Sequence, residues 1–238
     1  MRLMTTTLWA YPSQHYDGRS TEQGDKTYAG GTPSWVIWQL LTRYTREGDA
    51  VLDPMCGGGT TIDVCADLGR TPLGFDLAPS RPDIRQSDAR SLPLDAGSAD
   101  FVFLDPPYST HIEYSDDPNC IGKLDAAGDD GGEAYYAAMD AVFGEVDRVL
   151  KDRRYLAVYI SDSWRKQRGG PKGSGGGVFM PIGFELFALL RKRFRPIDVV
   201  CVVRRNAKLK QGQRHQAAAK DNFFIRGFNY LLIFKKER

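Results

Sequence analysis

The chain has 238 residues, of which 42% are hydrophobic and 26% are charged. This is the composition of an ordinary globular protein, and it excludes collagen, a coiled coil and wholesale disorder. The longest apolar runs, such as Tyr230–Phe234, are far shorter than the roughly 20 residues of a membrane-spanning helix. Residues 1–11 lack the apolar core of a secretory signal.

The net charge of +2 conceals two halves of opposite sign. Residues 1–134 contain 10 Lys/Arg and 21 Asp/Glu, whereas residues 135–238 contain 22 and 9. This division favours a polyanionic partner for the C-terminal half. The alternative, that both halves are solvated surfaces of unequal charge, remains open at this point.

Cysteines and histidines give no sign of a metal site. The four cysteines contain no C-x₂-C pair and are too scattered for a disulfide framework, and the three histidines are far apart in the sequence. We therefore expect a reduced, cytoplasmic protein without a bound metal and without a membrane association.

The predicted elements begin after an irregular arm, residues 1–33, which has no steady apolar period. A helix follows, with Ser34 or Thr32 as its N-cap and with its end before Gly48. Its apolar residues recur at the spacing of one helical face, which predicts that this face packs on the core.

A βα unit comes next, made of a buried strand at 50–53, a glycine turn at 56–59 and a helix through Leu68. The same reasoning predicts strands at 71–75, 84–87, 101–104, 155–160, 198–203 and 229–234, and helices at 135–151 and 184–194. The alternation of strands and helices predicts an α/β fold with a mostly parallel sheet and helices on both faces.

Three long segments are expected as loop insertions in a single domain that spans residues 34–238. Residues 109–134 hold seven acids and one lysine. Residues 163–180 are rich in glycine and contain four Lys/Arg and no acid, and residues 204–222 contain six Lys/Arg and one acid.

Acidic residues follow four of the predicted strands. Because ligands of a doubly wound sheet bind outside the carboxyl ends of its strands, these acids are candidates for one shared site. Each acid alone is equally well explained as a helix cap or a turn residue, but four together favour a ligand site. They are Asp53, Asp76, Asp88 and Asp105.

The sequence of the glycine turn excludes some classes of ligand. It lacks the G-x-G-x-x-G pattern of a dinucleotide site, and no lysine follows it as a phosphate loop requires. Asp76 lies 23 residues after Asp53, which is close to the spacing at which an acid binds ribose hydroxyls. The sequence therefore predicts a nucleoside-containing ligand without phosphates.

The segment Asp105-Pro106-Pro107-Tyr108 is the most specific signal in the chain. Two prolines restrict the backbone and should make a stiff spur that presents a carboxylate, carbonyl oxygens and an aromatic ring. Such a spur suits an exocyclic amine on a planar base, with one N–H bound to Asp105, the other to the Pro106 carbonyl, and Tyr108 stacked on the ring. A plain strand ending is the alternative.

The glycine turn and the spur together resemble the S-adenosylmethionine-dependent DNA amino-methyltransferases, which make N6-methyladenine or N4-methylcytosine. The resemblance extends over residues 28–108. It implies a Rossmann-like, seven-stranded methyltransferase sheet whose last hairpin is antiparallel, and S-adenosylmethionine as cofactor. The chain departs from the family at Met55, where an aromatic residue is usual, and at Gly58, where serine is frequent.

The resemblance also implies roles for individual residues. Asp53 and the glycine turn would hold the methionine end of the cofactor, Asp76 its ribose and Asp88-Ala89 its adenine. The cofactor-binding candidates are Tyr28, Thr32, Pro33, Asp53, Met55, Cys56, Gly57, Gly59, Thr60, Thr61, Asp76, Asp88 and Ala89. The catalytic candidates are Asp105, Pro106, Pro107 and Tyr108.

The target base of such an enzyme must leave the duplex, and contacts to the DNA backbone must offset the unstacking. The basic segments are the candidates for these contacts. Sequence readout would come from them, from residues 109–134, or from a partner chain or second copy. The nucleic-acid-binding candidates are Arg165, Lys166, Arg168, Lys172, Arg204, Arg205, Lys208, Lys210 and Arg214.

The function expected from these features is methyl transfer to the exocyclic amino group of a flipped base in double-stranded DNA, with N6 of adenine favoured, as in restriction–modification systems. An N4-cytosine enzyme and an RNA amino-methyltransferase are alternatives. A protein glutamine methyltransferase would carry Asn where this chain has Asp105. A non-catalytic nucleic-acid-binding module is the remaining alternative.

Overall fold

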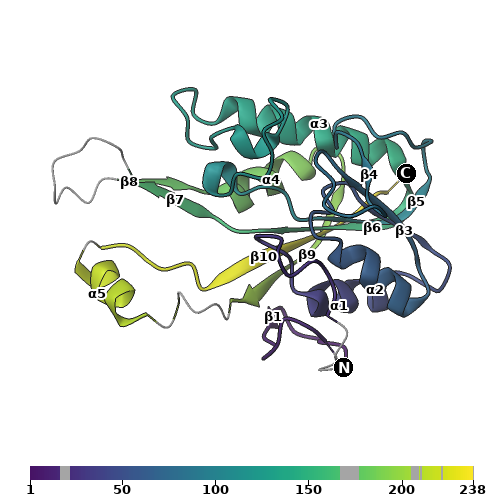
Figure 1. The fold of residues 1–238 in the computed structure, drawn as a ribbon, viewed down its shortest axis with the longest axis horizontal. Helices are drawn as coiled ribbons and strands as arrows, with labels where there is room; N and C mark the ends of the chain where they lie inside the picture. The colour runs from purple at the N-terminus through teal and green to yellow at the C-terminus, as the bar shows by residue number, and fades with distance from the viewer. Residues whose placement is uncertain (17–21, 167–176, 205–208, 210, 221, 238) are drawn as a thin grey trace.

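The computed structural model describes residues 1–16, 22–166, 177–204, 209, 211–220 and 222–237 (Figure 1). Its centre is an eight-stranded sheet with the strand order β1-β9-β10-β6-β5-β2-β3-β4. The strands are β1 Leu8–Trp9, β2 Ala50–Asp53, β3 Thr71–Asp76, β4 Arg85–Gln86, β5 Ala99–Leu104, β6 Leu150–Ile160, β9 Arg195–Val203 and β10 Phe228–Lys235. Every pairing is parallel except those of β10, which runs antiparallel to both β6 and β9.

The predicted α/β class is therefore confirmed, with the last hairpin antiparallel, but the sheet has eight strands and not seven. The additional strand is β1, which lies in the N-terminal arm and pairs with β9 through Leu8↔Cys201 and Trp9↔Val202. Trp9 is 3% exposed and packs beside Trp35. A strand of two residues is too short to show an alternating apolar pattern, so the sequence could not reveal β1.

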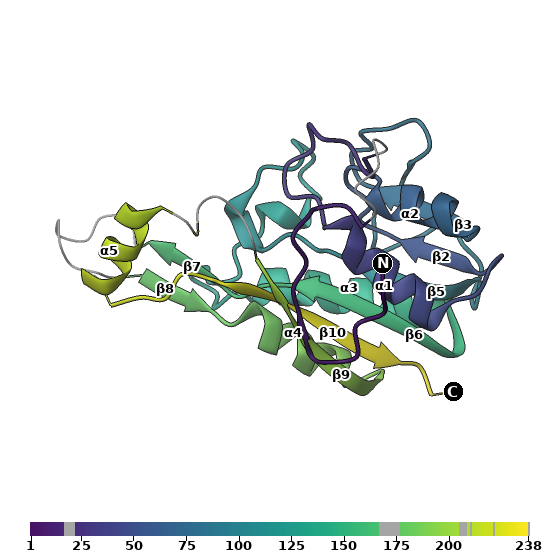
Figure 2. The same cartoon turned by 90° about the horizontal axis from the view of Figure 1, so that it is seen from below.

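Four helices cover the sheet, two on each face (Figure 2). On one face, α1 (Ser34–Tyr44) and α2 (Thr60–Leu68) pack with alternate strand residues such as Phe101 and Phe103. On the other face, α3 (Glu133–Val149) and α4 (Ile182–Leu190) pack with the intervening residues such as Val102. The central strand β5 is thus buried on both sides, whereas β3, β4 and β9 keep exposed residues.

The start of α1 differs from the expectation. Pro33 occupies the N-cap position, and no side chain caps the helix. Ser34 lies inside the helix and its hydroxyl donates to Gln23 Oε1 at 2.9 Å. The Thr32 hydroxyl is likewise used elsewhere, since it donates to Asp105.

Two of the expected loop segments contain regular structure. Residues 163–180 include the antiparallel hairpin of β7 (Ser163–Lys166) and β8 (Gly177–Met180), and residues 204–222 include helix α5 (Gly212–Lys220). Both project from the same end of the molecule (Figure 1). The acidic segment contains two 3-10 turns, η1 (Ser109–His111) and η2 (Ile121–Lys123). Within the described residues, no helix is long and apolar enough to cross a membrane.

Candidate functional site

Strand order brings the four acids together at one edge of the sheet. β5, β2, β3 and β4 are neighbours in that order, so the acids at or just after their carboxyl ends follow one another as Asp105, Asp53, Asp76 and Asp88. After β2 the chain adds β3 and β4 on one side of it, and then returns to add β5 and β6 on the other side. The strand order therefore reverses between β2 and β5. This is the position at which open α/β sheets bind their ligands.

Two adjoining clefts open at this edge. The first has a volume of about 570 Å³, including space open to solvent, and the second about 390 Å³. Tyr28, Met55, Asp105 and Tyr114 line both, so the two clefts meet beside the carboxylate of the spur. Of the cofactor candidates, the first cleft is also lined by Asp76, Asp88 and Ala89, and the second by Thr32, Asp53, Cys56, Gly57, Thr60 and Thr61.

A few candidates lie outside this lining. Pro33 stands at the start of α1, and Gly59 faces the guanidinium group of Arg81. Within the spur, Pro106 is buried, and the Tyr108 ring packs on the core. Pro107 lines the first cleft.

The glycine turn adopts a backbone that other residues avoid. Gly57 has φ +50° and Gly59 has φ +80°, in the left-handed region that favours glycine. A Cβ atom on Gly57 would stand 2.7 Å from Cε1 of Tyr28. Glycine at this position therefore serves both the backbone turn and the close approach of Tyr28.

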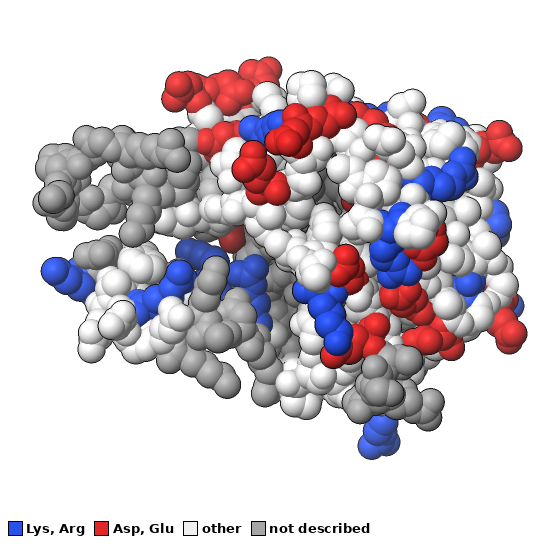
Figure 3. All heavy atoms as spheres, viewed as in Figure 1, with Lys and Arg blue, Asp and Glu red and all other residues white. Residues whose placement is uncertain are grey.

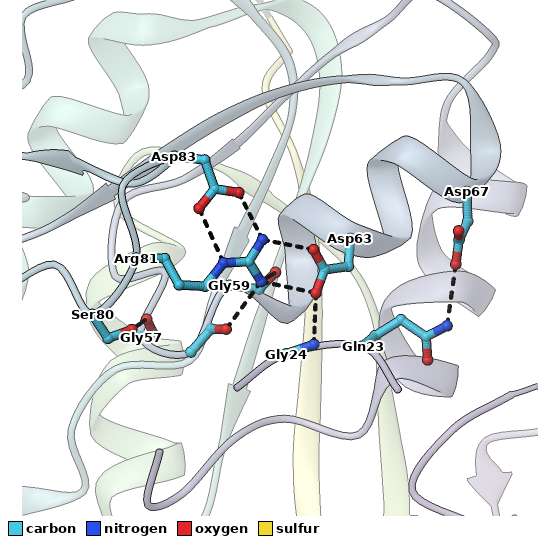
Figure 4. Close-up of polar contacts among 10 residues, drawn as sticks. Gln23, Gly24, Gly57, Gly59, Asp63, Asp67, Ser80, Arg81 and Asp83 are labelled. Atoms are coloured by element: carbon cyan, nitrogen blue, oxygen red, sulfur yellow. Dashed lines mark hydrogen bonds and ion pairs between the residues drawn. The ribbon is translucent and has the colours of Figure 1, made fainter. Parts of the chain in front are cut away.

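The N-terminal arm lies over the turn and is held there by polar contacts (Figure 4). The Gly24 N–H donates to Asp63 Oδ2 at 2.7 Å, and the Asp25 N–H donates to the Gly58 carbonyl at 2.8 Å. Arg81 binds both oxygens of Asp63 at 2.8 Å. The contacts tie the arm to α2, so Tyr28 is positioned by a segment that is distant in sequence.

Asp53 is buried behind the turn, with 4% of its surface exposed. The Thr61 hydroxyl donates to Oδ2 at 2.5 Å and the Met55 N–H to Oδ1 at 3.1 Å. Burial outweighs these hydrogen bonds and raises the pKa of Asp53 from 3.8 to about 7.

The next two acids differ in their partners. Asp76 accepts hydrogen bonds from the Gly57 and Ala78 N–H groups, each at 2.9 Å, and burial raises its pKa. The Asp88 carboxylate is held by Arg90, whose Nη2 lies 2.5 Å from Oδ2. Burial alone would raise the pKa of Asp88, but the hydrogen bonds from Arg90 lower it on balance.

The spur is held from three directions. The Thr32 hydroxyl donates to Asp105 Oδ2, and the Tyr108 hydroxyl donates to Oδ1 at 2.9 Å. Asn229 Nδ2, from β10, donates to the Tyr108 hydroxyl at 3.1 Å, and the Tyr135 hydroxyl, from α3, donates to the Pro107 carbonyl at 2.7 Å.

These contacts leave Asp105 in a largely apolar setting. Burial raises its pKa from 3.8 to about 7, although the hydrogen bonds from Thr32 and Tyr108 and the positive charge of Arg204 favour the ionised form. A carboxyl group with this pKa can exchange a proton near neutral pH.

The acidic segment contributes a wall of the first cleft that sequence reasoning missed. The Tyr114 ring lies against Tyr28, with centroids 6.2 Å apart and an angle of 28° between the planes. The one available signal was an aromatic residue within an acidic segment, which does not specify a position. The lining residues from this segment are Tyr114, Ser115, Asn119, Cys120 and Ile121.

The candidates for nucleic-acid contacts are described only in part. Arg204 is half-buried at the end of β9, where its N–H donates to the Gly227 carbonyl at 2.9 Å, and Arg214 is exposed on α5. Arg165 and Lys166 lie in β7, but their side chains are outside the described part of the chain. The remaining candidates, Arg168, Lys172, Arg205, Lys208 and Lys210, also lie outside it.

Residues 3–86 match the model of the N6_N4_Mtase family, described as DNA methylase. Among curated relatives, the type II methyltransferase M.BamHI of Bacillus amyloliquefaciens is 33% identical over 72 residues, which are 29% of this chain and 16% of that protein. M.HpaI of Haemophilus parainfluenzae is 29% identical over 72 residues, 30% of this chain and 22% of that protein. The matched region is therefore about a fifth of these relatives' length.

Solved structures show the same fold at low sequence identity. The geranyl diphosphate C-methyltransferase of Streptomyces coelicolor A3(2) has a TM-score of 0.53 at 13% identity, covering 86% of this chain and 76% of that one. The [4+2]-cyclase SpnF has a TM-score of 0.51 at 16% identity, covering 89% and 84%.

The family match supports the resemblance at the glycine turn, which lies within residues 3–86, whereas the spur at 105–108 lies beyond the matched residues. Over residues 3–86 the chain is similar to the N6_N4_Mtase family of DNA methylases, and shorter stretches of it are similar to type II methyltransferases.

Proposed function

We propose that this protein transfers a methyl group from S-adenosylmethionine to the exocyclic amino group of a base flipped out of DNA, and that the base is adenine, methylated at N6. One observation carries the proposal: the Asp105 carboxylate lines both the cleft of Asp76 and Asp88 and the cleft of the glycine turn. A nucleoside-containing ligand in these clefts would end beside the spur.

The residues present fit the cofactor. The glycine turn lines the second cleft, and the absence of a Cβ on Gly57 lets the Tyr28 ring lie against the turn and line the same cleft. Both Asp76 oxygens already accept one N–H, and because a carboxylate oxygen accepts two hydrogen bonds, each can still accept a ribose hydroxyl. Ala89 and Met55 supply apolar lining for the adenine side. When bound, the cofactor supplies an electrophilic methyl group.

The spur acts on the amine. Asp105 accepts one amino N–H and the Pro106 carbonyl accepts the other, so the nitrogen lone pair is held away from the ring. It is then free to form the new N–C bond as the methyl group leaves the sulfonium sulfur, which would keep the electron pair of the broken C–S bond. The methylated nitrogen then releases one proton. Asp105 can hold that proton, because burial has raised its pKa to about 7.

In this proposal the hairpin β7–β8 and the basic segment 204–222, which contains α5, supply the DNA contacts. Lys and Arg side chains gather between the hairpin and α5, at the end of the molecule from which both project (Figure 3). Contacts of these side chains to phosphates would offset the unstacking of the target base. N4 of cytosine in DNA is the alternative target, since the same spur would hold either amine.

The test is methyl transfer from labelled S-adenosylmethionine to unmethylated duplex DNA, total RNA and a protein extract, followed by digestion and mass spectrometry of the nucleosides. We expect label in DNA as N6-methyladenine. Label as N4-methylcytosine would change the base, and label only in RNA or protein would refute the DNA substrate.

The matched variant is Asp105→Ala. It removes an acceptor for the amine but no predicted cofactor contact, so turnover should fall by at least about 1,000-fold while cofactor affinity stays within about threefold. Near-normal turnover of this variant would show that the spur is not the catalytic group.

A further inference from the structure

We propose that an aromatic surface at the base of two projecting arms, the hairpin β7–β8 and the segment 204–228, stacks on unpaired DNA bases. The surface consists of Trp164, Phe179, Arg226 and Phe228. The inference deepens the proposed function and rests on it, but its test is independent of methyl transfer.

The surface begins with a cross-strand pair on the hairpin. Trp164 of β7 lies opposite Phe179 of β8, and their ring centroids are 6.5 Å apart. Both rings remain accessible, at 38% and 41% exposure. Exposed aromatic residues that adjoin one another on a surface indicate a binding site more often than isolated ones do.

The second arm completes the surface. Arg226, which precedes β10, places its guanidinium carbon 5.2 Å from the centroid of the Phe179 ring. Its Nε is buried and has no hydrogen-bond partner within the described residues. Phe228, 40% exposed, continues the aromatic surface along β10. Planar groups from both arms therefore form one surface.

The strands that carry this surface are held beside the spur by neighbouring residues. Ser163, the residue before Trp164, is in hydrogen-bonding contact with His111, which follows the spur in η1. Asn229, the residue after Phe228, donates to the hydroxyl of Tyr108 in the spur. Because successive residues of a strand point to opposite faces, Trp164 and Phe228 lie on the faces of β7 and β10 away from these two contacts and remain open to a ligand.

The charge of the two chain segments that carry the surface favours one class of partner. Residues 163–180 contain four Lys/Arg and no acid, and residues 204–228 contain seven Lys/Arg and one acid. A cationic setting for flat apolar rings suits a polyanion that carries its own flat apolar faces. Single-stranded nucleic acid has this character, because every unpaired base offers a face for stacking. An acidic protein partner lacks such faces and is disfavoured.

The surface would stabilise a duplex from which one base has been flipped out. Extrusion breaks the stacking on both neighbours of the target and leaves its former partner unpaired. Rings that stack on these exposed faces replace part of the lost stacking and stabilise the opened duplex.

The experiment compares two 20-nucleotide ligands by fluorescence anisotropy, an oligothymidylate and an abasic chain with the same phosphates. Neither contains adenine, so no methyl transfer occurs. We expect the protein to bind the oligothymidylate at least about tenfold more tightly than the abasic chain. Trp164→Ala and Phe179→Ala should abolish this preference, and Trp164→Phe should retain it.

Two control variants separate stacking from charge and from folding. Arg214→Ala, on α5, should weaken both ligands equally, and Leu8→Ala, an exposed apolar residue on β1, should change neither. Equal wild-type affinity for the two ligands, or an unchanged preference in Trp164→Ala and Phe179→Ala, overturns the inference. Failure of methyl transfer overturns the proposed function and leaves this binding result standing.

Discussion

Among single residues, two buried carboxyl groups have the strongest influence on the chemistry of the site. Burial raises the pKa of both Asp53 and Asp105 to about 7, but their surroundings differ. Asp53 lines the second cleft, with its oxygens bound to Thr61 and Met55, whereas Asp105 lines both clefts. Under the proposed function, the same shift would affect the stability of the fold at Asp53 and methyl transfer at Asp105.

The pH dependence of turnover should follow Asp105. The amine must be bound by the ionised carboxylate, so kcat/KM should rise with pH, reach half its maximum near pH 7 and fall about tenfold per unit below it. Cofactor affinity measured over the same range provides the control. A profile that stays flat down to about pH 5 would contradict the assignment of Asp105.

The pH dependence of stability should follow Asp53. Its folded-state pKa of about 7 lies above the ordinary 3.8, so the folded state holds the proton more tightly and stability is lost as pH rises from about 4 to 7. Asp53→Asn cannot ionise and should avoid this loss. Its unfolding free energy should exceed that of the wild type at pH 8, at about 1.4 kcal/mol per unit of pKa shift, and approach it near pH 4. Urea unfolding at both pH values measures the difference, and equal stability at pH 8 would contradict it.

At the scale of elements, the site depends on segments that are held together across the fold. The arm at 22–28 lies over the glycine turn through contacts to Gly58 and Asp63, and Tyr28 reaches the cleft in this way. The start of β10 supports the spur through Asn229. Neither the turn nor the spur is thus a self-contained motif.

Gly57→Ala should disable the turn. The substitution places a Cβ 2.7 Å from the Tyr28 ring and adds the strain of a positive φ, about 1–2 kcal/mol for a residue other than glycine. Cofactor affinity measured by calorimetry should fall by at least about 100-fold. Gly97→Ala is the matched control, since Gly97 also has a positive φ but no atom within 4 Å of the added Cβ. Equal affinities of the two variants would exclude the collision as the cause.

At the scale of the whole molecule, the sheet order and the distribution of charge divide the protein in two. The acids of the site lie at the ends of β5, β2, β3 and β4, in the half whose charge is negative. The hairpin and α5 project from the basic half, and Lys and Arg gather between them (Figure 3). A polyanion bound between the arms would approach the spur from the basic side.

DNA affinity should therefore depend steeply on salt. Arg214→Ala removes one exposed cation from α5 and should reduce the slope of log affinity against log salt by about one. Arg46→Ala, an exposed arginine in the acidic half, should leave the slope unchanged. Anisotropy titrations of duplex DNA at several salt concentrations measure both, and equal slopes for wild type and Arg214→Ala would contradict the prediction.

The sequence alone determined the features that depend on neighbours in the chain. The strand at 50–53, the helix through Leu68 and the acids after the strands follow from apolar period, glycine and proline, which act over a few residues. The order of those acids along the sheet edge required the pairing of strands, which no local pattern records.

Only the tertiary structure decided the contacts between distant segments. Thr32 meets Asp105 across 73 positions, and Asn229 meets Tyr108 across 121. β1 forms because β9 offers a free edge, and the hairpin of β7 and β8 pairs across a glycine-rich segment whose composition favours a loop. Such contacts stabilise an element through partners that fold beside it, so their signal is spread over the whole chain and is absent from the segment itself.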